Sequence, residues 1–189
     1  MNIFYLDSRP HVAAKDHCDK HVVKMILESA QMLCTAHREL DGDVPDVFYK
    51  STHKNHPSTI WARSEVGNYR WLYDLFVSLC DEYTYRYGKT HLSDKKLRES
   101  LSHHPRNISF GEYTQPPQCM PDEYKCDDSV TAYRNYYKGV KSSIATWNNN
   151  RPAPERARNG GKNDFSRYVS DPNRQPNGWG EYLLQRDEH

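Results

Sequence analysis

The stretch DHCDKHVVKMILE, residues 16–28, decides how the rest of the sequence is interpreted. At about 100° per residue it separates into an apolar stripe and a polar ridge, as an amphipathic helix does. We expect the apolar stripe to face the core. Its members, continued to residue 34, are Val22, Val23, Ile26, Leu27, Ala30, Leu33 and Cys34. The polar ridge holds His17, His21, Lys24 and Glu28, with Gln31 close by.

The polar ridge places two imidazoles, an ammonium and a carboxylate in one column. Such a set suits a metal site, a phosphate site or a proton-transfer site, although a solvated helix face has the same pattern. Asp19 projects towards the apolar stripe, where a carboxylate needs a partner or caps the helix start. The candidate catalytic residues are therefore His17, His21, Asp19 and Glu28.

The composition of the 189-residue chain limits the class of protein. The length fits one domain, and the net charge of +1 gives no global signature of nucleic-acid or membrane binding. Five cysteines without a CxxC pair argue against a disulfide framework. No apolar run reaches the ~20 residues that span a bilayer, and the start lacks a signal-peptide pattern. We expect a cytoplasmic protein without membrane contact.

Helical patterns cover most of the chain before residue 147. They span residues 8–38, 58–87, 93–101 and 127–147. We expect a break near His17, and Gly88 is a suitable helix end. The apolar run at residues 2–6 predicts one short strand, and the prolines of residues 105–127 predict an ordered loop. The predicted fold is mainly α, a small helical bundle with one short N-terminal strand and a Pro-rich ordered loop.

The composition changes beyond residue 147. The sequence becomes rich in Asn, Gly, Pro and basic residues, which cannot build a core. We therefore expect a helical catalytic or binding domain at residues 1–147. A polar, partly flexible basic extension follows at residues 148–189.

A metal site is one interpretation of the histidines. His17 and His21, four residues apart on a helix, point the same way, and His53 and His56 would supply two further ligands. The zinc-protease motif needs Glu after the first histidine, where this sequence has Cys18. This interpretation predicts a metal-dependent hydrolase of another kind, with a divalent metal as cofactor.

A phosphate site is the competing interpretation of the same region. His56 lies just before an expected helix start, where free N–H groups favour anions. Neither a GxxxxGK[ST] loop nor a GxGxxG turn is present, so a standard nucleotide fold is excluded. The alternative is that these residues are scattered surface cations that form no binding site. The candidate substrate-binding residues of this region are Lys20, Lys24, Lys54, Asn55, His56 and Arg63.

The Pro-rich segment 115–125 and the Tyr-rich helix after it form a third candidate region. Asp122 and Tyr124 could read the edge of a base, and Arg134 lies among tyrosines suited to stacking. A stiff connection and ordinary core contacts explain the same residues. We add Asp122, Tyr124 and Arg134 to the candidate substrate-binding residues.

Four motifs together resemble a family of small proteins from tailed bacteriophages and some bacteria. They are MNIFYLD (1–7), CDKHVVKM (18–25), HKNHP (53–57) and MPDEY (120–124). The resemblance covers roughly residues 1–150. It implies a protein of the host-cell cytoplasm and nucleotide or DNA chemistry. By analogy, this includes thymine modification in phage DNA, in which an activated base pyrophosphate is displaced.

The leading prediction is a phage-type enzyme that acts on a nucleotide or nucleic-acid base and handles a phosphate or pyrophosphate group. His17 and His21 would act as acid and base, and Glu28 would orient them. The alternatives are the metal-dependent hydrolase and a non-catalytic protein that binds DNA or a nucleotide. The expected partner is thus a nucleotide or nucleic acid.

Overall fold

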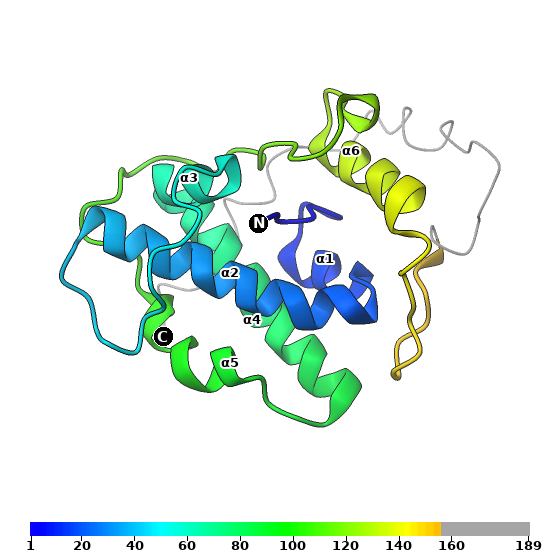
Figure 1. Cartoon of the computed structure of the whole chain (residues 1–189), viewed down its shortest axis with the longest axis horizontal. Helices are drawn as coiled ribbons and strands as arrows, with labels where there is room; N and C mark the ends of the chain where they lie inside the picture. Colours follow the sequence, from blue (N-terminus) through cyan, green and yellow to red (C-terminus); the bar gives the residue numbers. More distant parts are fainter. Residues whose placement is uncertain (156–189) are drawn as a thin grey trace. The chain divides into compact units, whose positions relative to one another are not determined.

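Helix α2 lies at the centre of the fold. The computed structural model describes residues 1–155. Helices α2 (Asp19–Leu40) and α4 (Val66–Tyr87) are the longest two and pack against each other (Figure 1). Helix α1 (Pro10–Asp16) packs on α4, and α3 (Pro57–Ser64) packs on both long helices. The prediction of a mainly helical bundle is confirmed, including the break near His17.

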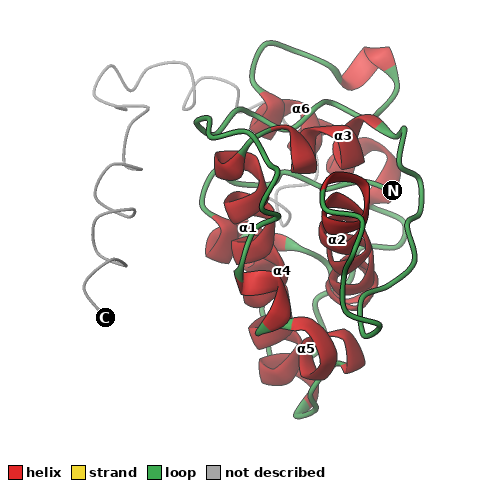
Figure 2. Ribbon diagram, turned by 90° about the vertical axis from the view of Figure 1, so that its left-hand side faces the viewer, coloured by secondary structure: helices red, strands yellow, loops and turns green. Residues whose placement is uncertain are grey.

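Shorter elements complete the bundle. They are α5 (Leu92–Leu97), the 3-10 turns η1 (Ser100–Ser102) and η2 (Asp122–Tyr124), α6 (Ser129–Tyr136) and the π turn η3 (Tyr137–Lys141). Figure 2 shows α5 at one end of the long helices and α3 and α6 at the other. No helix within residues 1–155 is both long and apolar enough to pass through a membrane.

The prediction of a strand at residues 2–6 is wrong. Residues 1–155 contain no strand for this segment to pair with, so it is an extended chain between α2 and α6 (Figure 1). Side chains hold it instead: the Phe4 ring stacks on His21 at 4.4 Å, and Arg134 Nε donates to the Leu6 carbonyl at 2.7 Å.

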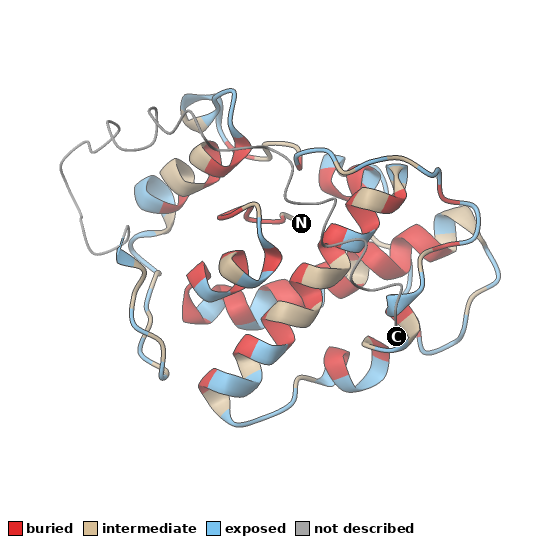
Figure 3. Ribbon diagram, turned by 180° about the vertical axis from the view of Figure 1, so that it is seen from behind, coloured by how far each residue is buried: buried red, intermediate tan, exposed pale blue. Residues whose placement is uncertain are grey.

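The buried side of α2 differs in part from the predicted apolar stripe. Val23 and Leu27 are 39% and 41% exposed, whereas His17 and His21 are 0% and 4% exposed. The N-terminal segment and the π turn η3 cover the histidine side of the helix start through Phe4 and Tyr137, whereas Val23 and Leu27 face water. The other predicted stripe residues are fully buried: Val22, Ile26, Ala30, Leu33 and Cys34. Figure 3 shows buried residues concentrated where the long helices face the rest of the bundle.

The predicted second helix is divided at Glu65 into α3 and α4. The Pro-rich loop crosses this point, where Ser109 O accepts a hydrogen bond from Val66 N at 2.9 Å. A Cβ atom on Gly67 would lie 2.3 Å from Tyr113 N, so only glycine permits this close approach. At the other end of α4, Gly88 is left-handed with φ of 63°, which confirms the predicted helix end.

Helix α6 begins as predicted but ends early. The Asp128 side chain accepts a hydrogen bond from Thr131 N at 2.9 Å and so caps the helix start. The helix ends at Tyr136 and continues only as the π turn, short of the predicted end at residue 147. Of the predicted basic extension, residues 156–189 lie outside the described residues.

A buried ion-pair network joins three helices to the end of the described chain. The Arg86 side chain is fully buried and contacts Asp19 at 3.0 Å and Glu82 at 2.7 Å. It also donates to the Lys15 carbonyl at 3.1 Å, and Arg151 reaches Glu82 at 2.7 Å. These contacts supply the partner that a buried Asp19 was expected to need.

We expect Arg86→Met to lower the free energy of unfolding by about 3–5 kcal/mol, because two buried carboxylates lose their partner. Urea unfolding followed by circular dichroism measures this loss. Lys54→Met is the control, since Lys54 is 59% exposed and pairs with Glu39 at 3.6 Å; it should cause no measurable loss. Equal losses in the two variants would contradict a stabilising role for the network.

Candidate active site around Glu28

The Glu28 carboxylate on α2 meets the first residues of the chain. Its Oε2 accepts a hydrogen bond from Asn2 N at 3.0 Å and lies 3.9 Å from the Met1 amino nitrogen. Its Oε1 lies 3.3 Å from Lys24 Nζ, one helical turn earlier. The Glu28 side chain is 14% exposed. A carboxylate reachable from solvent thus lies between an amino terminus and a lysine.

His56, the residue just before α3, interacts electrostatically with the same carboxylate. Its Nδ1 accepts a hydrogen bond from Ser58 N at 3.2 Å, so the imidazole caps the helix start. Burial lowers the pKa of His56, the amino terminus and His53 lower it further, and Glu28 opposes them. The imidazole is therefore neutral near pH 7 and can exchange a proton or orient water. We call Met1, Asn2, Lys24, Glu28 and His56 the Glu28 cluster.

The Asn2 side chain is held from α6 and from the Pro-rich loop. Its Oδ1 accepts from Ile3 N at 2.8 Å and lies 2.8 Å from the Tyr133 hydroxyl. Its Nδ2 donates to the Cys119 carbonyl at 3.0 Å. The sequence patterns did not connect Asn2, Cys119 or Tyr133 with Glu28, because their contacts join distant parts of the chain.

His17 and His21 lie beneath the N-terminal segment rather than in an open cleft. His17 Nδ1 donates to the Ala13 carbonyl at 2.6 Å, and burial lowers the His17 pKa to about 4. His21 Nδ1 lies 2.5 Å from the Tyr137 hydroxyl, and burial lowers the His21 pKa to about 3. Both rings are buried and neutral at pH 7. Their placement suits packing and not the predicted acid–base role at a substrate.

Asp19 is separated from the Glu28 cluster. The two carboxylates lie nine residues apart on one helix, which is about 13 Å along its axis. Asp19 Oδ1 pairs with Arg86, and its Oδ2 accepts from Asn148 N at 2.8 Å. The structure therefore assigns Asp19 to the buried network and not to the predicted catalytic group.

The four histidines proposed as metal ligands are not brought together. Within residues 1–155, no three His, Cys, Asp or Glu side chains are close enough to share a metal ion. His53 is exposed and contacts the Thr52 hydroxyl at 2.8 Å, while His17 and His21 are engaged inside the bundle. This placement gives the metal-dependent alternative no support.

Most of the predicted cations are exposed on the surface. Lys20 and Lys24 are exposed on successive turns of α2, and Asn55 is exposed next to His56. Lys54 pairs with Glu39, and Arg63 is half-buried near the end of α3. These residues remain candidates for contacts with a substrate.

The predicted contacts from the third region lie elsewhere. Asp122 pairs with Lys125 at 2.6 Å on the surface. The Tyr124 ring packs against α6 and the turn that follows it. Arg134 pairs with Asp7 at 3.0 Å and thereby holds the N-terminal segment. The structure joins none of Asp122, Tyr124 and Arg134 to Glu28.

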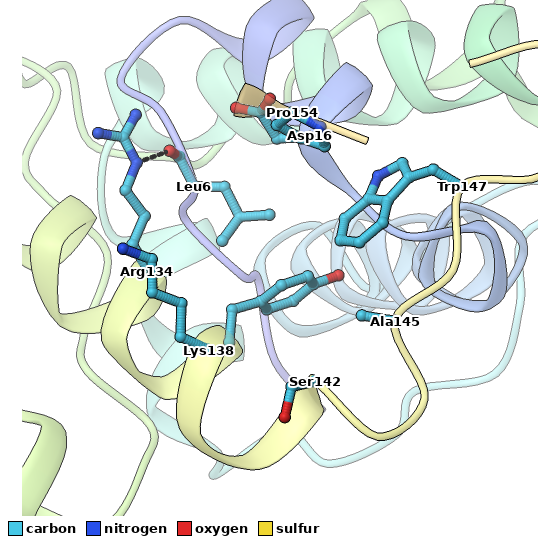
Figure 4. Close-up of a pocket in the computed structure, with 9 residues that line it drawn as sticks. Leu6, Asp16, Arg134, Lys138, Ser142, Ala145, Trp147 and Pro154 are labelled. Carbon is cyan, nitrogen blue, oxygen red and sulfur yellow. Dashed lines mark hydrogen bonds between the residues drawn. The ribbon is translucent and has the colours of Figure 1, made fainter. Parts of the chain in front are cut away.

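A cavity of about 130 Å³ lies beside Leu6 of the N-terminal segment (Figure 4). Leu6, Tyr137 and Trp147 are among its lining residues. The Arg134 side chain reaches the Leu6 carbonyl (Figure 4). No member of the Glu28 cluster lines this cavity. This cavity is therefore separate from the Glu28 cluster.

The amino acids that form the Glu28 cluster lie within a stretch that identifies the protein class. Residues 1–96 match the family model described as pyrimidine dimer DNA glycosylase, which is about half of the 189-residue chain. Neither a curated protein nor a solved structure matches the chain.

The chain belongs to the pyrimidine dimer DNA glycosylase family. This membership agrees with the prediction of an enzyme that acts on nucleic-acid bases, and it identifies DNA as the nucleic acid. The residues of α6 and of the Pro-rich loop that touch Asn2 lie beyond the matched stretch.

The two buried histidines predict that stability falls in acid. The pKa values of about 4 and about 3 in the folded protein lie below the usual value of roughly 6.5 for an unfolded chain. The unfolded chain therefore binds more protons below pH 6.5, and the free energy of unfolding decreases as the pH falls. Between pH 7 and pH 5 we expect a loss of about 2 kcal/mol per histidine.

Urea unfolding across this pH range tests the effect. A double variant, His17→Asn with His21→Gln, should have a flatter pH dependence than the natural chain. His53→Gln, at an exposed histidine, should leave the dependence unchanged. An equally steep dependence in the double variant would mean that other groups cause the acid sensitivity.

Proposed function

We propose that this protein is a DNA glycosylase that cleaves the glycosidic bond of one pyrimidine in a dimer, with the Glu28 cluster as its catalytic centre. The detached base stays joined to its neighbour through the cyclobutane ring, and base release here means this cleavage. The observation that carries the proposal is the Glu28 carboxylate held between the Met1 amino group and Lys24. Glycosylase chemistry needs a nucleophile and a negative charge near C1′ of the sugar, and the cluster offers both.

The proposed reaction replaces the bond between C1′ and the base. As that bond breaks, the base leaves with the electron pair and takes up a proton from solvent, while positive charge develops at C1′. A fixed carboxylate stabilises such charge, as in other glycosidic bond cleavages. The amine nitrogen then forms a bond to C1′ and gives up one proton. The C1′–O4′ bond breaks as O4′ takes up that proton, which opens the sugar ring and leaves an iminium between the amine nitrogen and C1′.

Two amines flank the carboxylate, and we assign the nucleophile to the amino terminus. An α-amine is by chemical type a weaker base than a lysine side chain, and the Met1 nitrogen lies 3.9 Å from Glu28 Oε2 beside a Met1 side chain that is only 2% exposed. Lys24 Nζ belongs to a side chain that is 62% exposed, which suits a phosphate contact. Glu28 would take the proton that the attacking amine gives up.

In this reaction the predicted phosphate-binding residues would bind the phosphates of the DNA backbone. Lys20, Lys24 and Lys54 are exposed cations, and Asn55 and Arg63 lie on the neighbouring loop and helix. They would neutralise phosphates on each side of the lesion, and affinity would then weaken steeply with added salt. The resemblance to proteins of tailed phages supports action on DNA in an infected host cell.

We expect Glu28→Gln to reduce base release at least about 100-fold, because an amide keeps the shape but removes the charge. The substrate is a duplex oligonucleotide with one cyclobutane thymine dimer. Binding of this duplex should change by less than threefold, roughly, since Glu28 makes no phosphate contact. Glu39→Gln is the matched control on the same helix and should keep full activity. Normal base release by Glu28→Gln would remove Glu28 from the mechanism.

Borohydride tests the assigned nucleophile, because it reduces an iminium to a stable bond between protein and DNA. Peptide mapping should place this bond on the first residue, and Lys24→Arg should retain it. A bond on Lys24 would contradict the assignment. Base release without any covalent product would also contradict it and make water the nucleophile. Binding of the dimer without base release would instead support the non-catalytic DNA-binding alternative.

A further inference from the structure

We infer that Tyr133 is a positioning residue of the Glu28 cluster: its hydroxyl fixes Asn2, and through Asn2 it keeps the start of the chain against Glu28. The inference rests on the proposed function, since it concerns how the nucleophilic amine is held. It adds a role for α6, which lies outside the family match.

The Tyr133 hydroxyl joins the N-terminal segment to the Pro-rich loop. Tyr133 is 0% exposed, and its hydroxyl oxygen lies 2.8 Å from both Asn2 Oδ1 and the Pro117 carbonyl oxygen. The same oxygen accepts a hydrogen bond from Cys119 N at 3.2 Å. Burial raises the pKa of Tyr133 above its usual range, so the hydroxyl keeps its proton as a donor.

Asn2 transmits this constraint to the catalytic carboxylate. The side chain is bonded to Tyr133 and to the Cys119 carbonyl, and the backbone nitrogen of the same residue donates to Glu28. Chain ends are usually poorly ordered unless contacts tie them down. A nucleophile at a chain end therefore needs such contacts, since a displacement of about 1 Å can slow a reaction about 100-fold.

A second contact, from the π turn η3 that follows α6, supports the same segment. Phe4 has φ of 47°, a left-handed conformation that a non-glycine residue keeps only when its surroundings enforce it. Its ring stacks on His21, and the Tyr137 hydroxyl bonds to His21. Tyr133 and Tyr137 lie one helical turn apart, so α6 and the turn after it hold the segment at two points.

Tyr133→Phe tests the inference, because it removes the hydroxyl and keeps the ring. The control is Tyr69→Phe, since Tyr69 is 1% exposed and its hydroxyl lies 2.9 Å from both His37 Nε2 and the Leu101 carbonyl oxygen. Neither of these hydrogen bonds involves a residue of the Glu28 cluster. Each variant loses one buried hydroxyl, so both should lose similar thermal stability.

We expect only Tyr133→Phe to lower kcat for base release, by about 10- to 100-fold, with KM changed by less than about threefold. The yield of borohydride-trapped protein per base released should fall in the same variant. If the role of Tyr133 is purely structural, Tyr133→Phe will lower the melting temperature without lowering kcat. If Tyr133→Phe does not fold, Asn2→Ala removes the partner group from the other side and should lower kcat similarly.

A Tyr133→Phe enzyme with the kcat and trapping yield of Tyr69→Phe would overturn the inference. Glu28→Gln, assayed on the same duplex, separates this outcome from failure of the proposed function. An inactive Glu28→Gln with an unimpaired Tyr133→Phe refutes the positioning role alone. An active Glu28→Gln refutes the proposed centre itself.

Discussion

The contact between the Glu28 carboxylate and the first two residues of the chain is the constraint on which the proposed site depends. It requires an extended N-terminal segment to remain inside the bundle without a neighbouring strand. Stacking on His21, the Arg134 hydrogen bond to Leu6 and the Asn2 side-chain bonds replace the missing strand pairing. Much of the polar chemistry near α2 therefore serves to hold this segment.

The helices could be predicted because their signals are local. The apolar period, the end at Gly88 and the cap at Asp128 each act within a few residues, and the structure has them. The burial of His17 and His21 could not be predicted in the same way. A helical pattern indicates one buried face, whereas the start of α2 is covered from a second side by the N-terminal segment and the π turn η3. The predicted strand failed since a strand exists only where a partner is available.

Some contacts of the candidate site could be predicted from the sequence and others could not. Lys24 and Glu28 lie four residues apart on one helix, so their proximity follows from the sequence. Asn2 is 26 residues from Glu28 and 131 residues from Tyr133, and no periodic pattern connects residues over such separations. Asp19 and Arg134 were good candidates by residue type, but charged residues also serve buried pairs, and only the fold shows which partner each has.

A crystal structure of the Glu28→Gln protein with a duplex that contains a thymine dimer tests the central claim most directly. The account predicts C1′ of a lesion nucleotide about 3–3.5 Å from the Met1 amino nitrogen, the separation of reacting atoms before attack. Residue 28 should lie beside that sugar, and Tyr133 should still hold Asn2. A complex in which the lesion lies away from the first residue of the chain, or in which that residue has left residue 28, would contradict the account.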